Sequence, residues 1–316
     1  KIRVSMEWSM TDEPDDLDTW TWQPETSCWA SNHEPQILRL DDFCVSMPHL
    51  ATGNLDLQNL PFQIKAALNF LRVVCPWEVV TNSEAAKMPT LLPPLREENK
   101  MRRTVVLDLD ETLVHCRPSP LDGPPAAMHL RIEQEKLSLN AHVYVRPYAP
   151  LLLETLATCF EVVIFTASAE IYADKVLDFL DPHRRCIAHR LYRQHCTVIQ
   201  GGHLKDVRRL GRRVEDVVLV DNSPVAVGLV PSSGILVSSW FGGDLEDVEL
   251  LNLLEMLERC SSHASTQEFL AKRYGVSDFL RRLCDPTVAA YVLGTPSAPH
   301  TGPSSPPGPI TQMTRP

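Results

Sequence analysis

The chain has 316 residues, of which 44% are hydrophobic, so it can bury one sizeable core with length to spare. Its net charge of −10 argues against a general nucleic-acid binder, because a phosphate backbone calls for a basic protein surface. No apolar stretch reaches the length of a membrane span, and we expect neither nucleic acid nor a membrane as a direct partner.

The nine cysteines are scattered, odd in number and without a C-x-x-C pair. This pattern is typical of reduced intracellular thiols and not of a disulfide framework. His189, His195 and Cys196 lie close in sequence, but they are a poor ligand set for zinc. We therefore expect ordinary core or surface roles for these three residues.

Residues 1–98 form an acidic N-terminal region of mixed character. Acidic residues crowd near its start, at Glu7, Asp12, Glu13, Asp15, Asp16 and Asp18. This run favours a solvated, disordered tail over its alternative, a docking segment for a basic partner. Apolar residues at helical spacing, including Ile64, Leu68 and Leu71, predict a short amphipathic helix over residues 63–74. Residues 91–94 are then typical of a linker.

Residues 101–283 alternate short apolar segments with amphipathic ones. We expect strands over residues 104–109, 143–145, 161–165, 187–192, 217–220 and 235–237. Helices are expected over residues 147–159, 170–180 and 244–259. This alternation predicts one α/β domain with a mainly parallel central sheet. From residue 285 to residue 316, Pro, Ser, Thr and Gly are abundant, which predicts a disordered tail.

Polar residues cluster around the ends of three of these strands, at the edge where ligands bind in folds of this kind. Each of them alone has a plain structural explanation, since an aspartate often caps a helix and a lysine is usually solvated. Together they favour a functional site. In chain order they are Asp108, Asp110, Thr166, Lys205, Asp221 and Asn222.

These residue types suit phosphoryl transfer. Asp108 and Asp110 are two positions apart and can share one side, so one carboxylate can attack phosphorus while the other supplies a proton. An anionic nucleophile that approaches an anionic phosphate calls for a hard cation, and Mg²⁺ suits the oxygens of Asp108 and Asn222. Lys205 and the Thr166 hydroxyl can hold the phosphoryl oxygens.

The sequences VVLDLDETLVHC, IFTAS, GGHLKD and LVDNSP occur in the order of the four motifs of the haloacid dehalogenase superfamily, the first in its D-x-D-x-T form. With VYVRP, LYRQHC and SSWF, the stretch from about residue 102 to residue 260 resembles the small phosphatases of the RNA polymerase II C-terminal domain. The resemblance implies a haloacid dehalogenase-like Rossmannoid fold with a small strand insertion and no large cap.

The resemblance also implies roles for the site residues. Asp108 is then the nucleophile and a metal ligand, and Asp110 is the general acid/base and a ligand through its backbone carbonyl. Asn222 is the third protein ligand, while Asp221 orients Lys205 or a metal-bound water. Thr166 and Lys205 bind phosphate, and Thr112 serves the turn and not the chemistry.

Chain length limits the size of any cap over the site. Thr166 follows Thr112 by 54 positions and Lys205 follows Thr166 by 39, and most of both stretches is already used by expected elements. An open site favours a protein as substrate. The resemblance implies that the insert at residues 117–141 helps form an apolar groove for the substrate peptide. It also implies that Tyr172 lines this groove and that Arg193 contacts the phosphopeptide. A partly buried helix aromatic is an equal alternative for Tyr172.

The insert departs from the family pattern at Pro118, Pro120, Pro124 and Pro125, so peptide specificity is the least direct of these expectations. Beyond Lys205, the basic run Arg208, Arg209, Arg212 and Arg213 predicts mostly a solvated face. Attraction of acidic phosphopeptides and nuclear import are alternatives for that run.

The sequence thus predicts a monomeric, Mg²⁺-dependent serine/threonine protein phosphatase that forms a phospho-aspartate. Its expected partner is a phosphorylated protein, such as RNA polymerase II tail peptides, in the nucleus or also in the cytoplasm. Two alternatives stay open: a phosphopeptide-binding module without turnover, and a small-molecule phosphatase or dehalogenase. The complete set of chemical residues argues against the first, and Asp110 would be idle in a dehalogenase.

Overall fold

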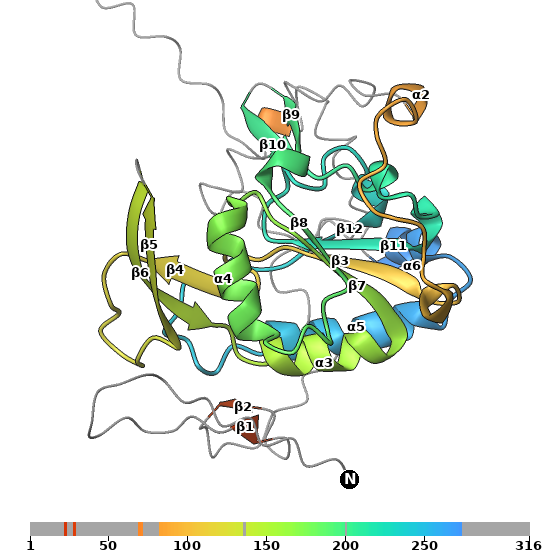
Figure 1. The fold of residues 1–316 in the computed structure, drawn as a ribbon. Coiled ribbons are helices and arrows are strands. Elements are labelled where there is room, and N and C mark those ends of the chain that lie inside the picture. The colour runs from red at the N-terminus through yellow and green to blue at the C-terminus, as the bar shows by residue number, and fades with distance from the viewer. Residues whose placement is uncertain are drawn as a thin grey trace, which may run out of the picture.

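The computed structural model describes residues 22–23, 28–29, 69–71, 82–134, 137–199 and 201–273. Five parallel strands form the central sheet, in the spatial order β12-β11-β3-β7-β8 (Figure 1). In that order their bounds are Gly234–Leu236, Val217–Asp221, Arg103–Leu107, Phe160–Phe165 and His189–Leu191. The predicted α/β class with a parallel sheet is confirmed.

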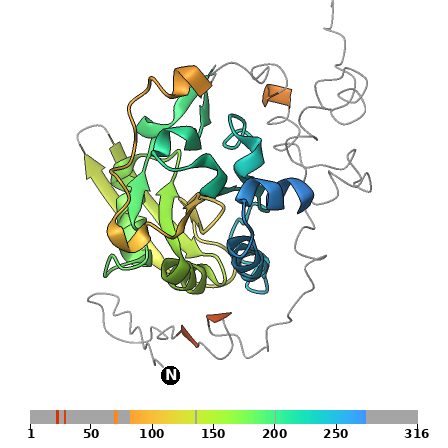
Figure 2. The ribbon, with the colours of Figure 1, turned by 90° about the vertical axis from the view of Figure 1, so that its right-hand side faces the viewer.

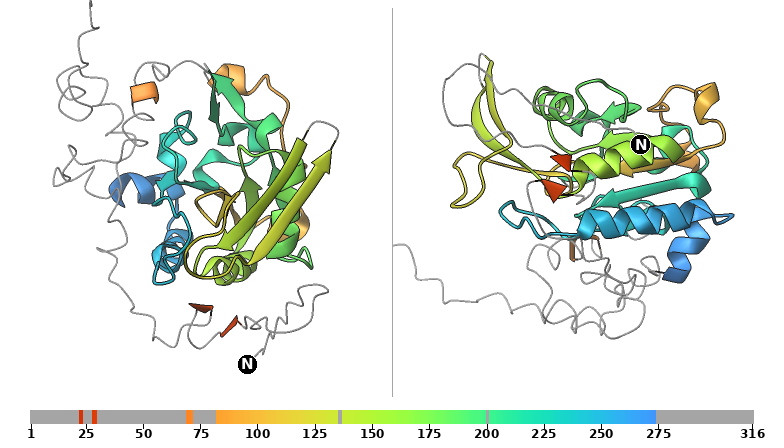
Figure 3. Two further views of the ribbon diagram at one scale, coloured as in Figure 1. Left: turned by 90° about the vertical axis from the view of Figure 1, so that its left-hand side faces the viewer. Right: turned by 90° about the horizontal axis from the view of Figure 1, so that it is seen from below.

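Three antiparallel strands form a second sheet, in the order β4-β6-β5, and its first strand follows the turn after β3. Their bounds in that order are Val114–Arg117, Leu137–Val145 and Met128–Gln134. This insert sheet stands to one side of the central strands (Figure 1; Figure 3, right). The predicted strand over residues 143–145 is the end of the nine-residue β6. β5 lies in the insert at residues 117–141, where a small strand insertion was predicted without strand bounds, and β4 was not predicted as a strand.

Two short hairpins complete the strands. β9 (Thr197–Ile199) pairs with β10 (Gly202–Leu204), and β1 (Trp22–Gln23) pairs with β2 (Cys28–Trp29). The β9–β10 hairpin lies directly before Lys205. It is therefore the element that delivers the lysine to the site.

The helices are short, and most of their bounds agree with the sequence. The α-helices are α2 (Asn82–Ala85), α3 (Ala149–Cys159), α4 (Glu170–Leu180), α5 (Glu249–Ser261) and α6 (Thr266–Arg273). The 3-10 helices are η3 (Glu97–Asn99), η4 (Arg193–His195), η5 (Val207–Leu210), η6 (Val214–Asp216) and η7 (Pro231–Ser233). α3 lies beside α5, which in turn contacts α6 (Figure 2; Figure 3, right).

Two helices begin later than predicted. α3 starts at Ala149 and not at Pro147, because Tyr148 has a left-handed backbone (φ 66°) that no helix interior accepts. α5 starts at Glu249 and not at Asp244, because tertiary contacts occupy the preceding residues. The Trp240 indole donates to the Asp244 carbonyl, and the Asp247 carboxylate pairs with Arg146.

Strand alternation divides the core into two clusters, one on each face of the sheet. Val105 and Leu107 of β3 join the apolar side chains of α3, α4 and α5 in the larger cluster. Val106 of β3 points to the other face and joins the smaller cluster with Val207 and Leu210 of η5. Because both faces are covered, the central strands are mostly apolar, as the sequence predicted, and their buried exceptions include Thr104 and Glu161.

Residues upstream of β3 pack against the domain. The Leu92 side chain is only 6% exposed and belongs to the smaller cluster, and Arg212 donates to the Pro93 carbonyl at 3.0 Å. The prediction of a linker over residues 91–94 is therefore wrong, since an apolar side chain there is part of the core. Of the predicted helix over residues 63–74, only residues 69–71 lie among those described, and they are helical.

The acidic run at residues 7–18 and the tail at residues 285–316 lie outside the described residues. Within the described ranges, every helix is too short or too polar to traverse a lipid bilayer. The division of the chain into an N-terminal region, a phosphatase domain and a tail stays a prediction.

Candidate active site

Three strands of the central sheet carry the predicted polar residues to its carboxyl edge. Asp108 directly follows β3, Asp221 is the last residue of β11, and Thr166 directly follows β7. Backbone pairing continues into this edge, because the Asp108 amide donates to the Val220 carbonyl at 2.9 Å. The sheet therefore holds the two aspartates side by side.

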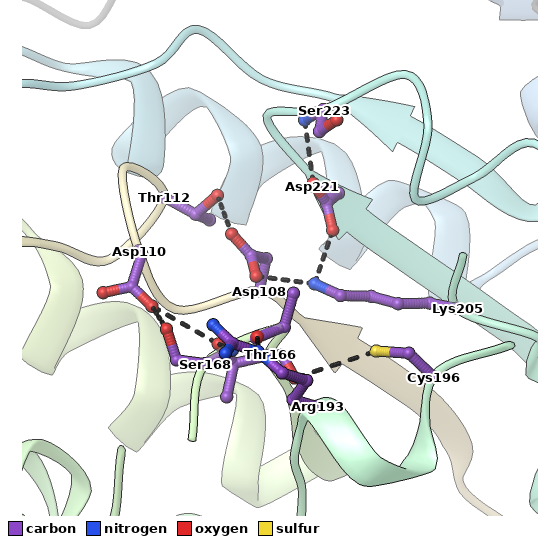
Figure 4. Close-up of polar contacts among 11 residues, drawn as sticks. Asp108, Asp110, Thr112, Thr166, Ser168, Arg193, Cys196, Lys205, Asp221 and Ser223 are labelled. Carbon is purple, nitrogen blue, oxygen red and sulfur yellow. Dashed lines mark hydrogen bonds and ion pairs between the residues drawn. The ribbon is translucent and has the colours of Figure 1, made fainter. Parts of the chain in front are cut away.

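Lys205 joins these two aspartates. Its ammonium lies 2.5 Å from Asp108 Oδ1 and 2.6 Å from Asp221 Oδ2, and its side chain is only 2% exposed (Figure 4). Burial by itself would lower the pKa of Lys205, but the two carboxylates outweigh it and raise that pKa. Lys205 is thus a permanently charged group at the centre of the site.

Asp221 is wholly buried and accepts a hydrogen bond from the Ser223 amide at 2.8 Å. Burial raises its pKa, and the nearby Asp108 raises it further, against the opposing effect of Lys205. In this geometry Asp221 and Asp108 hold the same Lys205 ammonium. That arrangement fits the expected role of Asp221 in orienting the lysine.

Three hydroxyls surround the carboxylate of Asp110. Tyr172 donates to Oδ1 at 2.5 Å, while Ser168 and Thr166 donate to Oδ2 at 2.7 and 3.3 Å. Burial raises the pKa of Asp110, the Tyr172 hydrogen bond opposes the rise, and the Asp108 carboxylate adds to it. A carboxyl group with a raised pKa suits a general acid, because it retains a proton to give.

The turn after β3 aims the two aspartates. Thr112 is fully buried and donates to Asp108 Oδ2 at 3.1 Å, so it positions the carboxylate as well as the turn. Glu111 adopts a left-handed backbone (φ 59°), and burial followed by the charges of Asp110 and Asp108 raises its pKa to about 7. Its carboxylate contacts the His115 imidazole at 3.1 Å.

Arg146 anchors this turn from behind and was not predicted as part of the site. Its fully buried guanidinium pairs with both Asp247 oxygens at 2.8 Å and donates to the Thr112 and Ser238 carbonyls. Only arginine carries several N–H donors in one planar group that can contact a carboxylate and two carbonyls together. Ser168 was also not assigned a role, although its place two residues after Thr166 could have indicated one.

Tyr172 and Arg193, the two predicted peptide contacts, differ in their exposure. Tyr172 is 9% exposed, as a largely buried helix aromatic would be, and its hydroxyl donates to Asp110, the expected acid. Its role in lining a peptide groove stays a prediction. Arg193 is exposed and donates from Nε to the Ala167 carbonyl at 2.6 Å, beside Thr166 and Ser168. Its position at the rim of the site stays compatible with a substrate contact.

The donor set fits a hard cation. Asp108 and Asp221 share the Lys205 ammonium and the Asp110 carboxylate lies near Asp108, so the site is rich in oxygen and short of positive charge. Asn222 donates from Nδ2 to Ser239 Oγ at 2.9 Å, which turns its amide oxygen away from that serine. Among the described residues no three His, Cys, Asp or Glu side chains form a metal cage, and the predicted ligands need none, since two of them are an amide and a backbone carbonyl.

The predicted solvated face beyond Lys205 is only partly correct. Arg212 is buried and pairs with Glu161 through two hydrogen bonds of 2.7 Å at the amino end of β7. Arg208 pairs with Asp206, whereas Arg213 is exposed. A run of basic residues thus contains both surface and core members, which spacing alone does not separate.

Fold and site together define a class, an α/β protein with two aspartates and a buried lysine at the carboxyl edge of a parallel sheet. The family described as NLI interacting factor-like phosphatase matches residues 103–270, just over half of the chain. The chain therefore belongs to this family.

Curated relatives bear out the resemblance to the small phosphatases. CTD small phosphatase-like protein 2 of Dictyostelium discoideum is 40% identical over 57% of this chain and 31% of its own length. CTD small phosphatase-like protein 3 of Caenorhabditis elegans is 36% identical over 62% of this chain and 72% of its own length. CTD nuclear envelope phosphatase 1B of Danio rerio is 38% identical over 56% and 74%. The chain thus spans about a third of the first relative and nearly three quarters of the other two.

A solved structure of Fcp1, an essential RNA polymerase II CTD phosphatase, is similar over 60% of this chain and 63% of that chain, with 18% identity and a TM-score of 0.38. The strand order of the central parallel sheet defines the fold of this chain.

Proposed function

We propose that this protein is a Mg²⁺-dependent serine/threonine protein phosphatase that works through a phospho-aspartate. Membership of a phosphatase family supports the reaction class. The observation that supports this mechanism is that the two aspartates at the carboxyl edge of the sheet have different partners. Asp108 is held by Lys205 and Thr112, whereas Asp110 is held by hydroxyls and keeps a raised pKa.

In the first step the Asp108 carboxylate attacks phosphorus, and the bond from phosphorus to the substrate oxygen breaks. Asp110 gives its proton to the departing serine or threonine oxygen, so the leaving group departs neutral. In the second step Asp110 takes a proton from water, and the water oxygen displaces Asp108 to release phosphate. Lys205 and Thr166 hold the phosphoryl oxygens as charge develops.

The predicted metal ligands are Asp108, the backbone carbonyl of Asp110 and the amide oxygen of Asn222. Mg²⁺ bound there would supply the positive charge that lets a carboxylate meet a phosphate. The surplus of carboxylates over lysine supports this assignment. Tyr172 and Ser168 keep the acid in place throughout.

The substrate that we propose is a phosphoserine or phosphothreonine within a protein. Between Thr112 and Lys205 the described chain is used by the insert sheet, α3, β7, α4, β8 and the β9–β10 hairpin, and a protein substrate brings its own bulk to the site. Relatives named for the C-terminal domain and the nuclear envelope favour a nuclear phosphoprotein. RNA polymerase II tail peptides are the first candidates.

The deciding experiment measures phosphate release from phosphoserine and phosphothreonine peptides with and without Mg²⁺. Asp108→Asn should abolish turnover, because an amide cannot attack phosphorus. Glu258→Gln, the same carboxylate-to-amide change at an exposed residue of α5, should behave as the wild type. Turnover that survives in Asp108→Asn or without any divalent metal would refute the mechanism. Binding of phosphopeptide without turnover by the wild type would favour the binding module.

A further inference from the structure

A short piece of chain far upstream of the family match is part of the main core. Residues 69–71 are helical, and they precede the matched region by more than thirty positions. The Leu71 side chain is only 1% exposed and belongs to the larger core cluster, and Phe70 packs against that cluster. Segment 69–71 is therefore built into the fold.

Leu71 fills space left by a glycine. A Cβ added at Gly228 would collide with Leu71 Cδ2 and would lie 3.4 Å from Leu204 Cδ2. Leu71 and Leu204 thus both pack over Gly228. In the same way a Cβ at Gly202 would stand 2.5 Å from the Phe70 ring. Segment 69–71 covers two stretches of chain at once, namely β10 and residues 225–229.

These two stretches are the ones that hold the lysine of the site. Lys205 directly follows β10, and its amide donates to the Ala226 carbonyl at 3.0 Å. Leu204, its neighbour, is fully buried. A shift of β10 against residues 225–229 would therefore move the Lys205 ammonium from its place between Asp108 and Asp221.

We propose that Leu71 is a positioning residue for Lys205, so that the catalytic unit of this protein begins upstream of residue 72. The catalytic part of this inference rests on the proposed phosphatase function. Its physical basis is that a close-packed interior transmits a change of volume at Leu71 to the backbone of β10. Leu71 touches none of the reacting groups and acts through Leu204 and Gly228.

The test compares three variants of the full chain. Leu71→Ala removes the side chain from Gly228, and Leu71→Met restores most of its volume. Leu156→Ala is the matched control, because Leu156 is equally buried in the same cluster but lies on α3, which packs on β7 and α5. If Leu71→Ala does not fold, Leu71→Val, which removes one methylene, gives a smaller change in the same direction.

The first readout is hydrogen exchange of the Lys205 amide, followed by mass spectrometry or NMR. We expect exchange to be about tenfold faster in Leu71→Ala, with no such change in Leu156→Ala or Leu71→Met. The second readout is kcat/KM with a phosphoserine peptide. It should fall by about tenfold to a hundredfold in Leu71→Ala and recover in Leu71→Met, since a misplaced lysine no longer meets the phosphoryl oxygens.

The two readouts separate this inference from the proposed function. A wild type without turnover sinks the proposed function, while exchange at Lys205 still decides whether Leu71 holds the lysine. Equal exchange and equal kcat/KM in Leu71→Ala and Leu156→Ala would overturn the inference, because Leu71 would then be ordinary core. Wild-type exchange in Leu71→Ala would overturn it as well.

Discussion

Two buried ion clusters lie at opposite ends of the same sheet and differ in their balance of charge. At the carboxyl edge, Lys205 stands between Asp108 and Asp221, with Asp110 close by. At the amino edge, Glu161 at the start of β7 meets the Arg212 fork, the Thr104 hydroxyl at 2.8 Å and His189. The first cluster has more carboxylates than cations, and the second is matched.

The pKa values follow that difference. Burial would raise the pKa of Glu161, but hydrogen bonds from Arg212, His189 and Thr104 together lower it to about 2. The pKa values of Asp110 and Asp221 are raised instead, because burial and neighbouring carboxylates prevail there. A buried cluster with matched charges stabilises the fold. A buried cluster with surplus carboxylates can bind a cation and transfer a proton.

The largest effect should come from Lys205→Met at the carboxyl edge. It removes the ammonium that pairs with Asp108, and we expect kcat/KM to fall by about 10²–10³-fold. Phosphate release from a phosphoserine peptide measures it. Lys175→Met, on the exposed face of α4, is the control and should leave turnover unchanged. Near wild-type turnover in Lys205→Met would show that the ion cluster at the carboxyl edge is not needed for catalysis.

The matching change at the amino edge is Arg212→Met. It leaves Glu161 buried without its guanidinium, which should lower the free energy of unfolding by about 3–5 kcal/mol. The kcat/KM of the folded protein should stay the same, since Arg212 lies away from the reacting groups. Urea unfolding and turnover, measured on one preparation, test both halves. Arg213→Met, at an exposed neighbour, should change neither quantity.

Acid should weaken the amino-edge cluster. The pKa of Glu161 is about 2 in the fold and ordinarily 4.5, so the unfolded chain binds the proton first as pH falls. The stability that Glu161 contributes is full above about pH 4.5 and is lost as pH falls to about 2, on the order of 3 kcal/mol in all.

This acid effect is measured as a difference between two proteins. The unfolding free energies of the wild type and of Glu161→Gln should differ most near neutral pH and converge in acid. A constant difference from pH 6 to pH 3 would mean that Glu161 keeps its ordinary pKa, and the contrast between the clusters would fail.

A smaller effect is expected from Tyr172→Phe, which removes the hydroxyl from Asp110 Oδ1. Loss of a hydrogen bond to a carboxylate is worth about 1.5 kcal/mol, or roughly tenfold in rate. The loss should appear with a phosphoserine peptide and shrink with an aryl phosphate, whose leaving group needs no proton. Tyr192→Phe, whose hydroxyl donates to Asp174, is the control. Equal losses on both substrates would contradict a role through the acid.

Much of the central fold followed from local pattern. The apolar segments of β3, β7 and β11 and the amphipathic α4 were predicted almost residue by residue, because a strand covered on both faces leaves little choice of side chain. A small strand insertion was predicted, but the bounds of β4 and β5 were not, since the prolines of the insert obscure the alternation of its strands. The starts of α3 and α5 were predicted too early. Tyr148 has a left-handed backbone, and the Asp247 carboxylate pairs with Arg146.

The candidate site was likewise predicted in part from the sequence. The sequence alone determined the order and spacing of Asp108, Asp110, Thr166, Lys205 and Asp221, and the topology of a parallel sheet then brings strand ends to one edge. That is why the reaction class could be predicted from motifs.

Only the tertiary structure decided how these residues are held. Three hydroxyls around Asp110, the buried pairing of Arg212 with Glu161 and the packing of Leu71 over Gly228 join positions far apart in the chain. No local period encodes such contacts. They arise because folding removes water from distant side chains together, and each buried polar or apolar group must then find its partner within the protein.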